Sequence, residues 1–131
     1  MMDYSAIERL AKIALAMRSR AYKPKNVDED LEGCVILDDR GVLHRGCSIH
    51  YDCDHLVIEA SSVSIASMIA SGSNSIQAIC MTDATPSLDA LMRIKEFSHQ
   101  ETVCFCVSKE DNKTHYIKIN IDSRIEKLSK L

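Results

Sequence analysis

The stretch LVIEASSVSIASMIAS (residues 56–71) is followed closely by SIQAICMTDATPSLDALMRIKEFS (residues 75–98). The first stretch carries one charged residue, Glu59. An apolar segment of this length without a polar face predicts a buried helix, and Gly72 directly after it is typical of a helix end. The second stretch opens with an apolar run that predicts a buried strand, and Ser87 is a candidate N-cap for the helix that follows. A buried helix, a buried strand and another helix in succession indicate an α/β fold.

The segments on either side add strands and helices to this centre. Residues 33–49 place Asp38-Asp39-Arg40-Gly41 between two apolar runs, which predicts a β-hairpin. Elsewhere the spacing predicts strands over 101–108 and 114–121, and helices over 3–20 (capped by Asp3 or Ser5) and 123–131 (capped by Asp122). The order helix, strand, strand, helix, strand, helix, strand, strand, helix implies a mixed sheet with helices on both faces. We therefore predict a three-layer α/β/α sandwich with a five-stranded mixed sheet.

Composition and charge narrow the class of protein. The chain has 131 residues, of which 46% are hydrophobic and 27% charged, as in one globular domain spanning residues 1–131 rather than a disordered chain. Sixteen basic against nineteen acidic residues give a formal charge of −3, so no nucleic-acid or membrane partner is indicated. No run reaches the roughly 20 apolar residues of a membrane helix. The opening MMDYSAIERLAKIALAMRSR lacks the pattern of a signal or transit peptide, and we expect a cytoplasmic protein.

The chain contains six cysteines, and no two of them are spaced as Cys-x-x-Cys. Those in apolar, strand-like runs are Cys34, Cys80, Cys104 and Cys106. Because free cysteine behaves as a small hydrophobic residue, we expect these to be reduced, buried thiols. The pattern also predicts that several histidines lie on the surface of strands or turns: His44, His99 and His115.

Several short motifs match one known family in order and spacing. They are Arg20-Ala21-Tyr22-Lys23-Pro24, Gly33-Cys34-Val35-Ile36-Leu37, Gly46-Cys47-Ser48-Ile49-His50, and Thr82-Asp83 with Pro86. Together with the nearly uncharged helix that has Glu59 near its start, they make nearly the whole chain resemble the cytidine deaminase family. The resemblance implies a cytidine-deaminase-like α/β/α sandwich. It also implies a homodimer or homotetramer in which neighbouring subunits complete each other's pockets.

The resemblance also implies where a zinc site would lie. Zinc deaminases carry the signature [HC]-x-E…P-C-x-x-C, in which three His or Cys ligands hold the metal and the Glu moves the proton. Here Val57-Ile58-Glu59 stands at the first motif and Pro86-Ser87-Leu88-Asp89-Ala90 at the second. Valine and alanine have no donor atom for zinc, and serine is a poor one. Glu59 thus keeps the proton-shuttle position, but Val57, Ser87 and Ala90 replace the ligands, and we expect no metal and no cofactor.

The substrate side of the family pattern has changed as well. Ser48 and His50 stand where the family's Asn and Glu hold the ribose hydroxyls. By resemblance, Ser48, His50 and Ser87 are candidate substrate-binding residues, and Glu59 is the candidate catalytic residue. A structural role for Glu59 is the alternative, because the helix dipole and free backbone amides favour a carboxylate in the first turn of a helix.

Three functions remain open for this sequence. The first is a non-catalytic homologue of cytidine deaminase that acts as a structural or binding protein. The second is a protein that binds a nucleoside without converting it. The third is an active nucleoside deaminase with a rewired metal site, for which the loop before the central helix offers candidate ligands: Cys53 and His55, with Asp52, Asp54 or His50.

Overall fold

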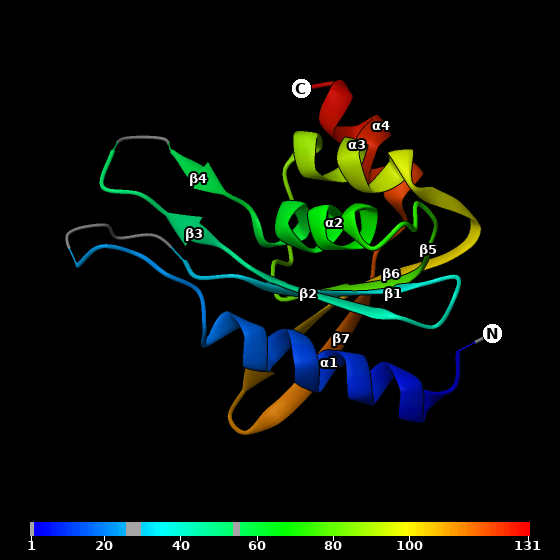
Figure 1. Ribbon diagram of the computed structural model, residues 1–131, viewed down its shortest axis with the longest axis horizontal. Coiled ribbons are helices and arrows are strands. Elements are labelled where there is room, and N and C mark those ends of the chain that lie inside the picture. The colour runs from blue at the N-terminus through cyan, green and yellow to red at the C-terminus, as the bar shows by residue number, and fades with distance from the viewer. Residues whose placement is uncertain (1, 26–29, 54–55) are drawn as a thin grey trace.

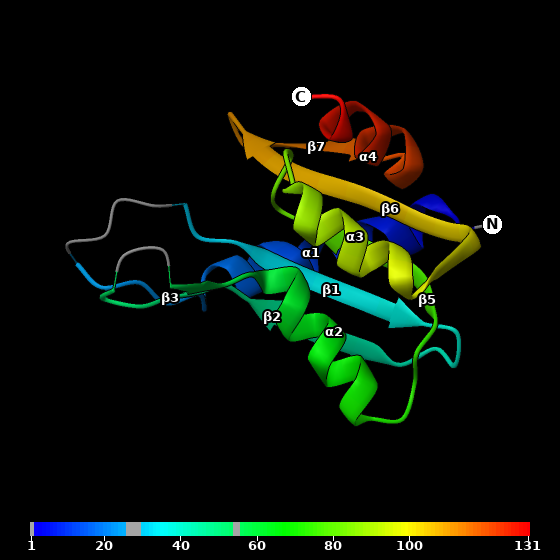
Figure 2. The same cartoon turned by 90° about the horizontal axis from the view of Figure 1, so that it is seen from above.

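The structure, a computed structural model, describes residues 2–25, 30–53 and 56–131. Its elements follow one another as α1 (Tyr4–Arg18), β1 (Gly33–Asp38), β2 (Leu43–Cys47), β3 (Ile49–His50), β4 (Val57–Ile58), α2 (Ala60–Ala70), β5 (Ile76–Met81), α3 (Leu88–Glu96), β6 (Ser98–Glu110), β7 (Lys113–Lys118) and α4 (Ile121–Ser129). Figure 1 shows this arrangement from the side, and Figure 2 shows it from above.

A five-stranded sheet forms the middle layer, with the strand order β2-β1-β5-β6-β7 (Figure 1). Strand β1 pairs antiparallel with both β2 and β5, whereas β5 and β6 are parallel and β7 returns antiparallel to β6. The sheet is therefore mixed, as the sequence predicts. The β3–β4 pair is a separate short ribbon that projects beyond the main sheet (Figure 1).

Helices cover both faces of the sheet. Helix α1 lies on one face, and α2, α3 and α4 lie on the other (Figures 1 and 2). Because successive side chains of a strand point to opposite faces, the core has two halves. Ile36 and Ile79 pack on the side of α2 and α3, whereas Val35 and Phe105 pack with Leu10 of α1. These two halves confirm the α/β/α sandwich.

Local signals at the start of α1 and in the β1–β2 turn act as the sequence predicts. Asp3 is the N-cap of α1, and its side chain accepts a hydrogen bond from the backbone N–H of Ala6 at 2.8 Å. In the turn, the Asp38 carboxylate accepts hydrogen bonds from the N–H groups of Arg40 and Val42. Gly41 has φ +84°, a conformation that favours glycine.

The segment before α2 is extended, so the predicted helix over 56–71 begins too early. Val57 and Ile58 form β4 and pair with β3, a conformation that suits β-branched side chains. Helix α2 begins at Ala60, with Glu59 in extended conformation at its N-cap. Glu59 therefore precedes the first turn of the helix instead of lying within it.

Helix α2 carries no charged residue, but only one of its faces is buried. That face consists of Ala60, Ser61, Ser64, Ile65 and Met68. The prediction of a wholly buried helix is wrong for the outer face, where Ile69 is exposed. On the inner face the small residues allow close packing, since a Cβ on Gly46 of β2 would lie 2.4 Å from the Ala60 carbonyl oxygen.

No helix in the part of the chain that the structure describes is long and apolar enough to span a bilayer.

The C-terminal elements differ in detail from the prediction. Strand β6 begins at Ser98 and is longer than the predicted 101–108. Helix α4 is capped by Asn120, whose side chain accepts from the N–H of Ser123 at 2.9 Å. Asp122 lies in the first turn of α4 rather than at its cap, because the helix begins two residues earlier than the sequence pattern predicts.

The cysteines behave as expected, whereas one histidine does not. The buried thiols are Cys34, Cys80, Cys104 and Cys106, and all are free. His99 and His115 are exposed, as predicted. His44 is only 3% exposed, so its predicted surface position is wrong. Its side chain lies on the inner face of β2 and bonds to the buried Asp38, a partner that hydrophobic patterning does not reveal.

Candidate functional site

The N-terminal ends of α2 and α3 approach each other, and Glu59 lies between them. Its carboxylate accepts a hydrogen bond from Arg93 Nη1 at 3.0 Å and one from Ser87 Oγ at 3.5 Å. The structure thus brings together two of the predicted site residues and adds Arg93, which the sequence reasoning missed. Arg93 follows Ala90 by three residues, so helical spacing places it on the same face as a family ligand position; that spacing was the available signal.

Glu59 does not bond to the free backbone amides at the start of α2, which is the structural role that the sequence leaves open for it. Glu59 is the N-cap residue, yet its side chain makes no capping hydrogen bond. The N–H of Ala60 donates instead to the carboxylate of Glu32. Glu59 is therefore held by the guanidinium of Arg93 and not by the free backbone amides of the helix.

The positions that the family resemblance assigns to zinc ligands have other tasks here. Val57 lies in β4 and pairs with His50. Ser87 is the N-cap of α3, and its hydroxyl accepts from the N–H of Ala90 at 3.1 Å. The Ala90 side chain is buried in the core. A hydrocarbon, a capping hydroxyl and a methyl group do not match the thiolate and imidazole donors that zinc prefers, so these residues do not fit the metal.

The cavity beside Glu59 is small. It is lined by Glu59, Pro86, Ala90 and neighbouring residues and has a volume of about 10 Å³. That volume holds roughly one water. Ser48, His50 and Ser87 do not line this cavity. The predicted grouping of Glu59 with all three substrate-binding candidates is therefore not formed around this cavity.

A pair of carboxyl groups, Glu32 and Asp83, lies on the wall of the same cavity. Burial raises the pKa of Glu32 to about 7, and a hydrogen bond to Asp83 together with the negative charges of Asp83 and Glu59 acts in the same direction. Glu32 precedes β1 and Asp83 follows β5. Because these strands are antiparallel neighbours, the two residues emerge at the same edge of the sheet. The sequence shows that each residue flanks an apolar run, but it does not show that these two runs are neighbours in the sheet.

The Glu32–Asp83 pair also lines a much larger cleft. This cleft has a volume of about 810 Å³ and lies between the C-terminal end of α1 and the loop after β5. Arg18 and Lys23 face it as well, so both signs of charge are present. Small-molecule sites typically have volumes of about 300–1,000 Å³, and the cleft falls within this range.

Ser48 and His50 are buried residues that tie segments of the fold together. The hydroxyl of Ser48 accepts from the N–H of Glu32 at 2.9 Å, and its carbonyl accepts from the N–H of Tyr22 at 3.1 Å. The N–H of His50 donates to the carbonyl of Tyr22 at 2.9 Å. These contacts fasten the segment after α1 to β3.

The rewired metal site predicted near Cys53 is only partly within the structure. Cys53 is exposed, and Asp52 is described as well, whereas Asp54 and His55 lie outside the described residues. Among the residues that are described, no group of three or more His, Cys, Asp or Glu side chains is placed to hold a metal ion.

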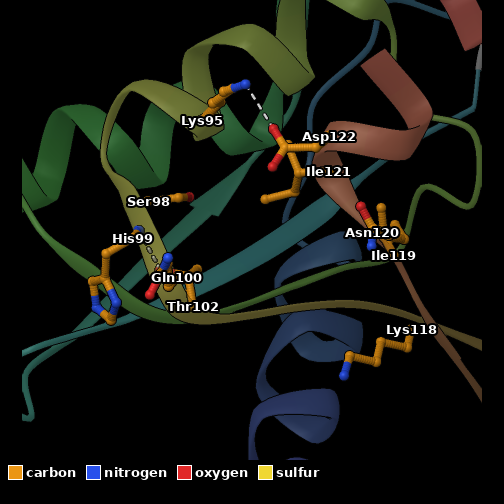
Figure 3. Close-up of a pocket in the computed structure, with 10 residues that line it drawn as sticks. All are labelled: Lys95, Ser98, His99, Gln100, Thr102, Lys118, Ile119, Asn120, Ile121 and Asp122. Atoms are coloured by element: carbon orange, nitrogen blue, oxygen red, sulfur yellow. Dashed lines mark hydrogen bonds and ion pairs between the residues drawn. The ribbon is translucent and has the colours of Figure 1, made fainter. Parts of the chain in front are cut away.

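Another cavity, of about 660 Å³, lies between the C-terminal end of α3 and the start of α4 (Figure 3). Two of its basic side chains bond to carboxylates. Lys95 pairs with Asp122 at 2.6 Å, as the dashed line in Figure 3 shows, and His99 bonds to Asp39 at 3.2 Å. None of the residues predicted for the site lines it, so we place the candidate site at the start of α2 and α3.

Comparison with solved structures identifies the fold. The cytidine deaminase from Burkholderia pseudomallei superposes with a TM-score of 0.70 over 94% of this chain and 96% of its own, at 17% identity. The enzyme from Mycobacterium tuberculosis superposes with a TM-score of 0.66 over 83% of this chain and 88% of its own, at 17% identity. The enzyme from Mycobacterium leprae superposes with a TM-score of 0.65 over 84% of this chain and 92% of its own, also at 17% identity. No protein-family model and no curated protein matches the sequence. The chain therefore has the cytidine deaminase fold.

Proposed function

Starting from that fold, we propose that this chain is a degenerate homologue of cytidine deaminase, without deaminase activity, that acts as a structural or binding protein. The observation that carries the proposal is the set of side chains at the ligand positions. Val57 and Ala90 have no donor atom, and the hydroxyl of Ser87 caps α3. In zinc deaminases the metal-activated water attacks the base, and these three residues supply no thiolate or imidazole to hold that metal.

The partner of Glu59 supports the same conclusion. A proton shuttle needs a carboxylate that can reach a water and a substrate. Here Oε1 of Glu59 accepts a hydrogen bond from Arg93, and the adjoining cavity has room for about one water. A pyrimidine ring does not fit in that volume.

Zinc analysis and cytidine turnover on one sample of the purified, untagged chain test the proposal. We expect less than about a tenth of a zinc ion per chain, because the donor set is absent, and no release of ammonia. Turnover would contradict the proposal, and Glu59→Gln is the control that assigns it, since activity from a contaminating deaminase would be unchanged in this variant. Close to one zinc per chain would instead favour the rewired site near Cys53 and His55.

Nucleoside binding without turnover is the second candidate, and the cleft beside Glu32 favours it. The cleft has the volume of a small-molecule site, and its carboxyl and cationic side chains match the amino, carbonyl and hydroxyl groups of a nucleoside. Its lining differs from the predicted set of Ser48, His50 and Ser87. Thermal unfolding with cytidine or uridine tests this candidate. A rise in Tm that Asp83→Asn abolishes would support it, and an unchanged Tm at millimolar nucleoside would argue against it.

We also propose that the chain forms a homodimer or homotetramer. Exposed apolar side chains on α2 and α3 support this, since Ile69 is 45% and Met92 52% exposed. Light scattering measures the mass in solution, and we expect Ile69→Glu with Met92→Glu to reduce it to that of a monomer. Ile117→Glu is the matched control, because Ile117 is similarly exposed (46%) but lies on β7. A wild-type mass equal to that of one chain would refute the proposal.

A further inference from the structure

A buried aspartate and histidine form a fixed pair between β1 and β2. Asp38 is 0% and His44 3% exposed, and Oδ2 of Asp38 lies 2.8 Å from Nε2 of His44. The other oxygen, Oδ1, accepts from the backbone N–H groups of Arg40 and Val42. Burial raises the pKa of Asp38, but the hydrogen bonds from His44 and from these amides outweigh it and lower the pKa to about 2. Asp38 is therefore an anion at neutral pH, and its Oδ2 accepts a hydrogen bond from Nε2–H of His44.

A serine of the opposing helix completes a chain of three side chains. Ser67, on the exposed face of α2, places its Oγ 3.4 Å from Nδ1 of His44. In the tautomer that carries its proton on Nε2, toward Asp38, the ring offers Nδ1 as an acceptor for the hydroxyl of Ser67. A hydroxyl, an imidazole base and a buried carboxylate that orients the base are the parts of an activated serine, which geometry rather than sequence position identifies.

A cation contacts α2 about one helical turn after this serine. Arg40 Nη2 donates to the carbonyl oxygen and to Oγ of Ser71 at 3.2 and 3.3 Å. Ser71 follows Ser67 by four residues, so the two lie on the same face at the end of α2. The same Nη2 lies 3.7 Å from Oδ2 of Asp38. A guanidinium is a group that can stabilise the negative charge that develops on a carbonyl oxygen during acyl transfer.

From this geometry we propose a second site, independent of the proposed function: Ser67 is an activated nucleophile that accepts acyl groups from carboxylic esters. His44 is the general base, and Asp38 is a positioning residue that acts through it. The hydroxyl oxygen of Ser67 attacks the ester carbonyl carbon, and its proton passes to Nδ1 of His44. The bond between that carbon and the alcohol oxygen then breaks, and the departing alcohol takes the proton from His44. The products are an acyl ester on Ser67 and the free alcohol.

An alkyl fluorophosphonate, which loses fluoride to an activated serine, is the probe for this site. The full chain is incubated with it, and labelled serines are located and timed by peptide mass spectrometry. We expect labelling at Ser67 and none there in Ser67→Ala, which keeps the fold because the side chain is exposed. The matched control is Ser129, another exposed helical serine, whose hydroxyl donates to the carbonyl of Ile125 at 2.8 Å. Equal rates at the two serines, or no label at Ser67, would overturn the proposal whether or not other variants fold.

Variants of the two buried residues test their separate roles. We expect His44→Gln to slow labelling of Ser67 by about 100-fold or more, as loss of a general base does. Asp38→Asn should lower the maximal labelling rate without changing the probe concentration at half-maximal rate, since Asp38 does not touch the probe. An unchanged rate in folded His44→Gln would overturn the proposed base, and a changed half-maximal concentration in Asp38→Asn would overturn the positioning role.

Discussion

Replacing the buried Asp38 by asparagine removes one negative charge from the hairpin while keeping the shape of the side chain. The pKa of Asp38 lies at about 2 in the folded chain, against an ordinary value of 3.8. A difference of this size, at about 1.4 kcal/mol for each pH unit, corresponds to about 2 kcal/mol of stability at neutral pH. The His44 bond and the two backbone amides that favour the charged form are its physical source.

The pH dependence of this contribution follows from the depressed pKa. Above about pH 4 the carboxylate is charged in both the folded and the unfolded chain, so its full contribution is present. As the pH falls from 4 towards 2, the unfolded chain binds a proton that the folded chain resists, and the contribution is lost. Asp38→Asn should therefore lower the free energy of unfolding at pH 7 by about 2 kcal/mol, and lower Tm by roughly 5–10 °C. The difference from wild type should shrink as the pH approaches 2.

Urea unfolding at pH 7, 5 and 3, followed by circular dichroism, measures these differences. The matched control is Asp39→Asn, in the same turn, because Asp39 is exposed and its loss should change stability much less. Two results would refute the reasoning: an Asp38→Asn variant as stable as wild type at pH 7, or a loss of stability that is the same at pH 7 and pH 3. The first would show that the buried hydrogen bonds contribute no net stability, and the second that charge is not their source.

Other perturbations have equally definite expectations. Ser87→Ala removes the side-chain cap of α3 and should cost about 1 kcal/mol in urea unfolding, whereas an unchanged midpoint would mean that the cap is unimportant. Gly46→Ala places a Cβ 2.4 Å from the carbonyl oxygen of Ala60 and should destabilise the chain by about 1–3 kcal/mol; an equally stable variant would show that α2 can shift away. The pKa of Glu32 is raised from its ordinary value of 4.5 to about 7 in the folded chain. Between these two pH values the folded chain keeps a proton that the unfolded chain has released, so the free energy of unfolding falls as the pH rises from 4.5 to 7. Glu32→Gln should abolish that fall and raise the free energy of unfolding at pH 8 by on the order of 1 kcal/mol, after allowance for solvent screening. A wild-type stability that does not change between pH 4.5 and 7 would contradict this prediction. Arg93→Ala breaks a pair that is partly exposed and should cost less than about 1 kcal/mol, so a larger loss in the same assay would indicate a role in packing.

The sequence by itself was sufficient to predict the three layers of the fold. It also decided the donor chemistry of the three positions that hold zinc in the family that the chain resembles. Apolar periodicity is a local property, and it was strong enough to predict the mixed sheet with helices on both faces, which the structure confirms. The identity of Val57, Ser87 and Ala90 also decides their donor chemistry without any coordinates, because a hydrocarbon side chain has no lone pair to offer a metal. The early start predicted for α2 was wrong because the pairing of Val57 and Ile58 with β3 is a non-local interaction.

Only the tertiary structure decided which polar groups meet. Glu59 and Arg93 are 34 positions apart in the chain, and Ser67 and His44 are 23 apart. Whether such residues touch depends on strand register and on how closely a helix approaches the sheet, and neither is encoded in the spacing of apolar residues. The same reason explains Glu32 and Asp83, whose shared position exists because β1 and β5 are antiparallel neighbours. Sequence periodicity predicts the elements and their layers, and the packing of the layers determines which polar groups meet in the interior.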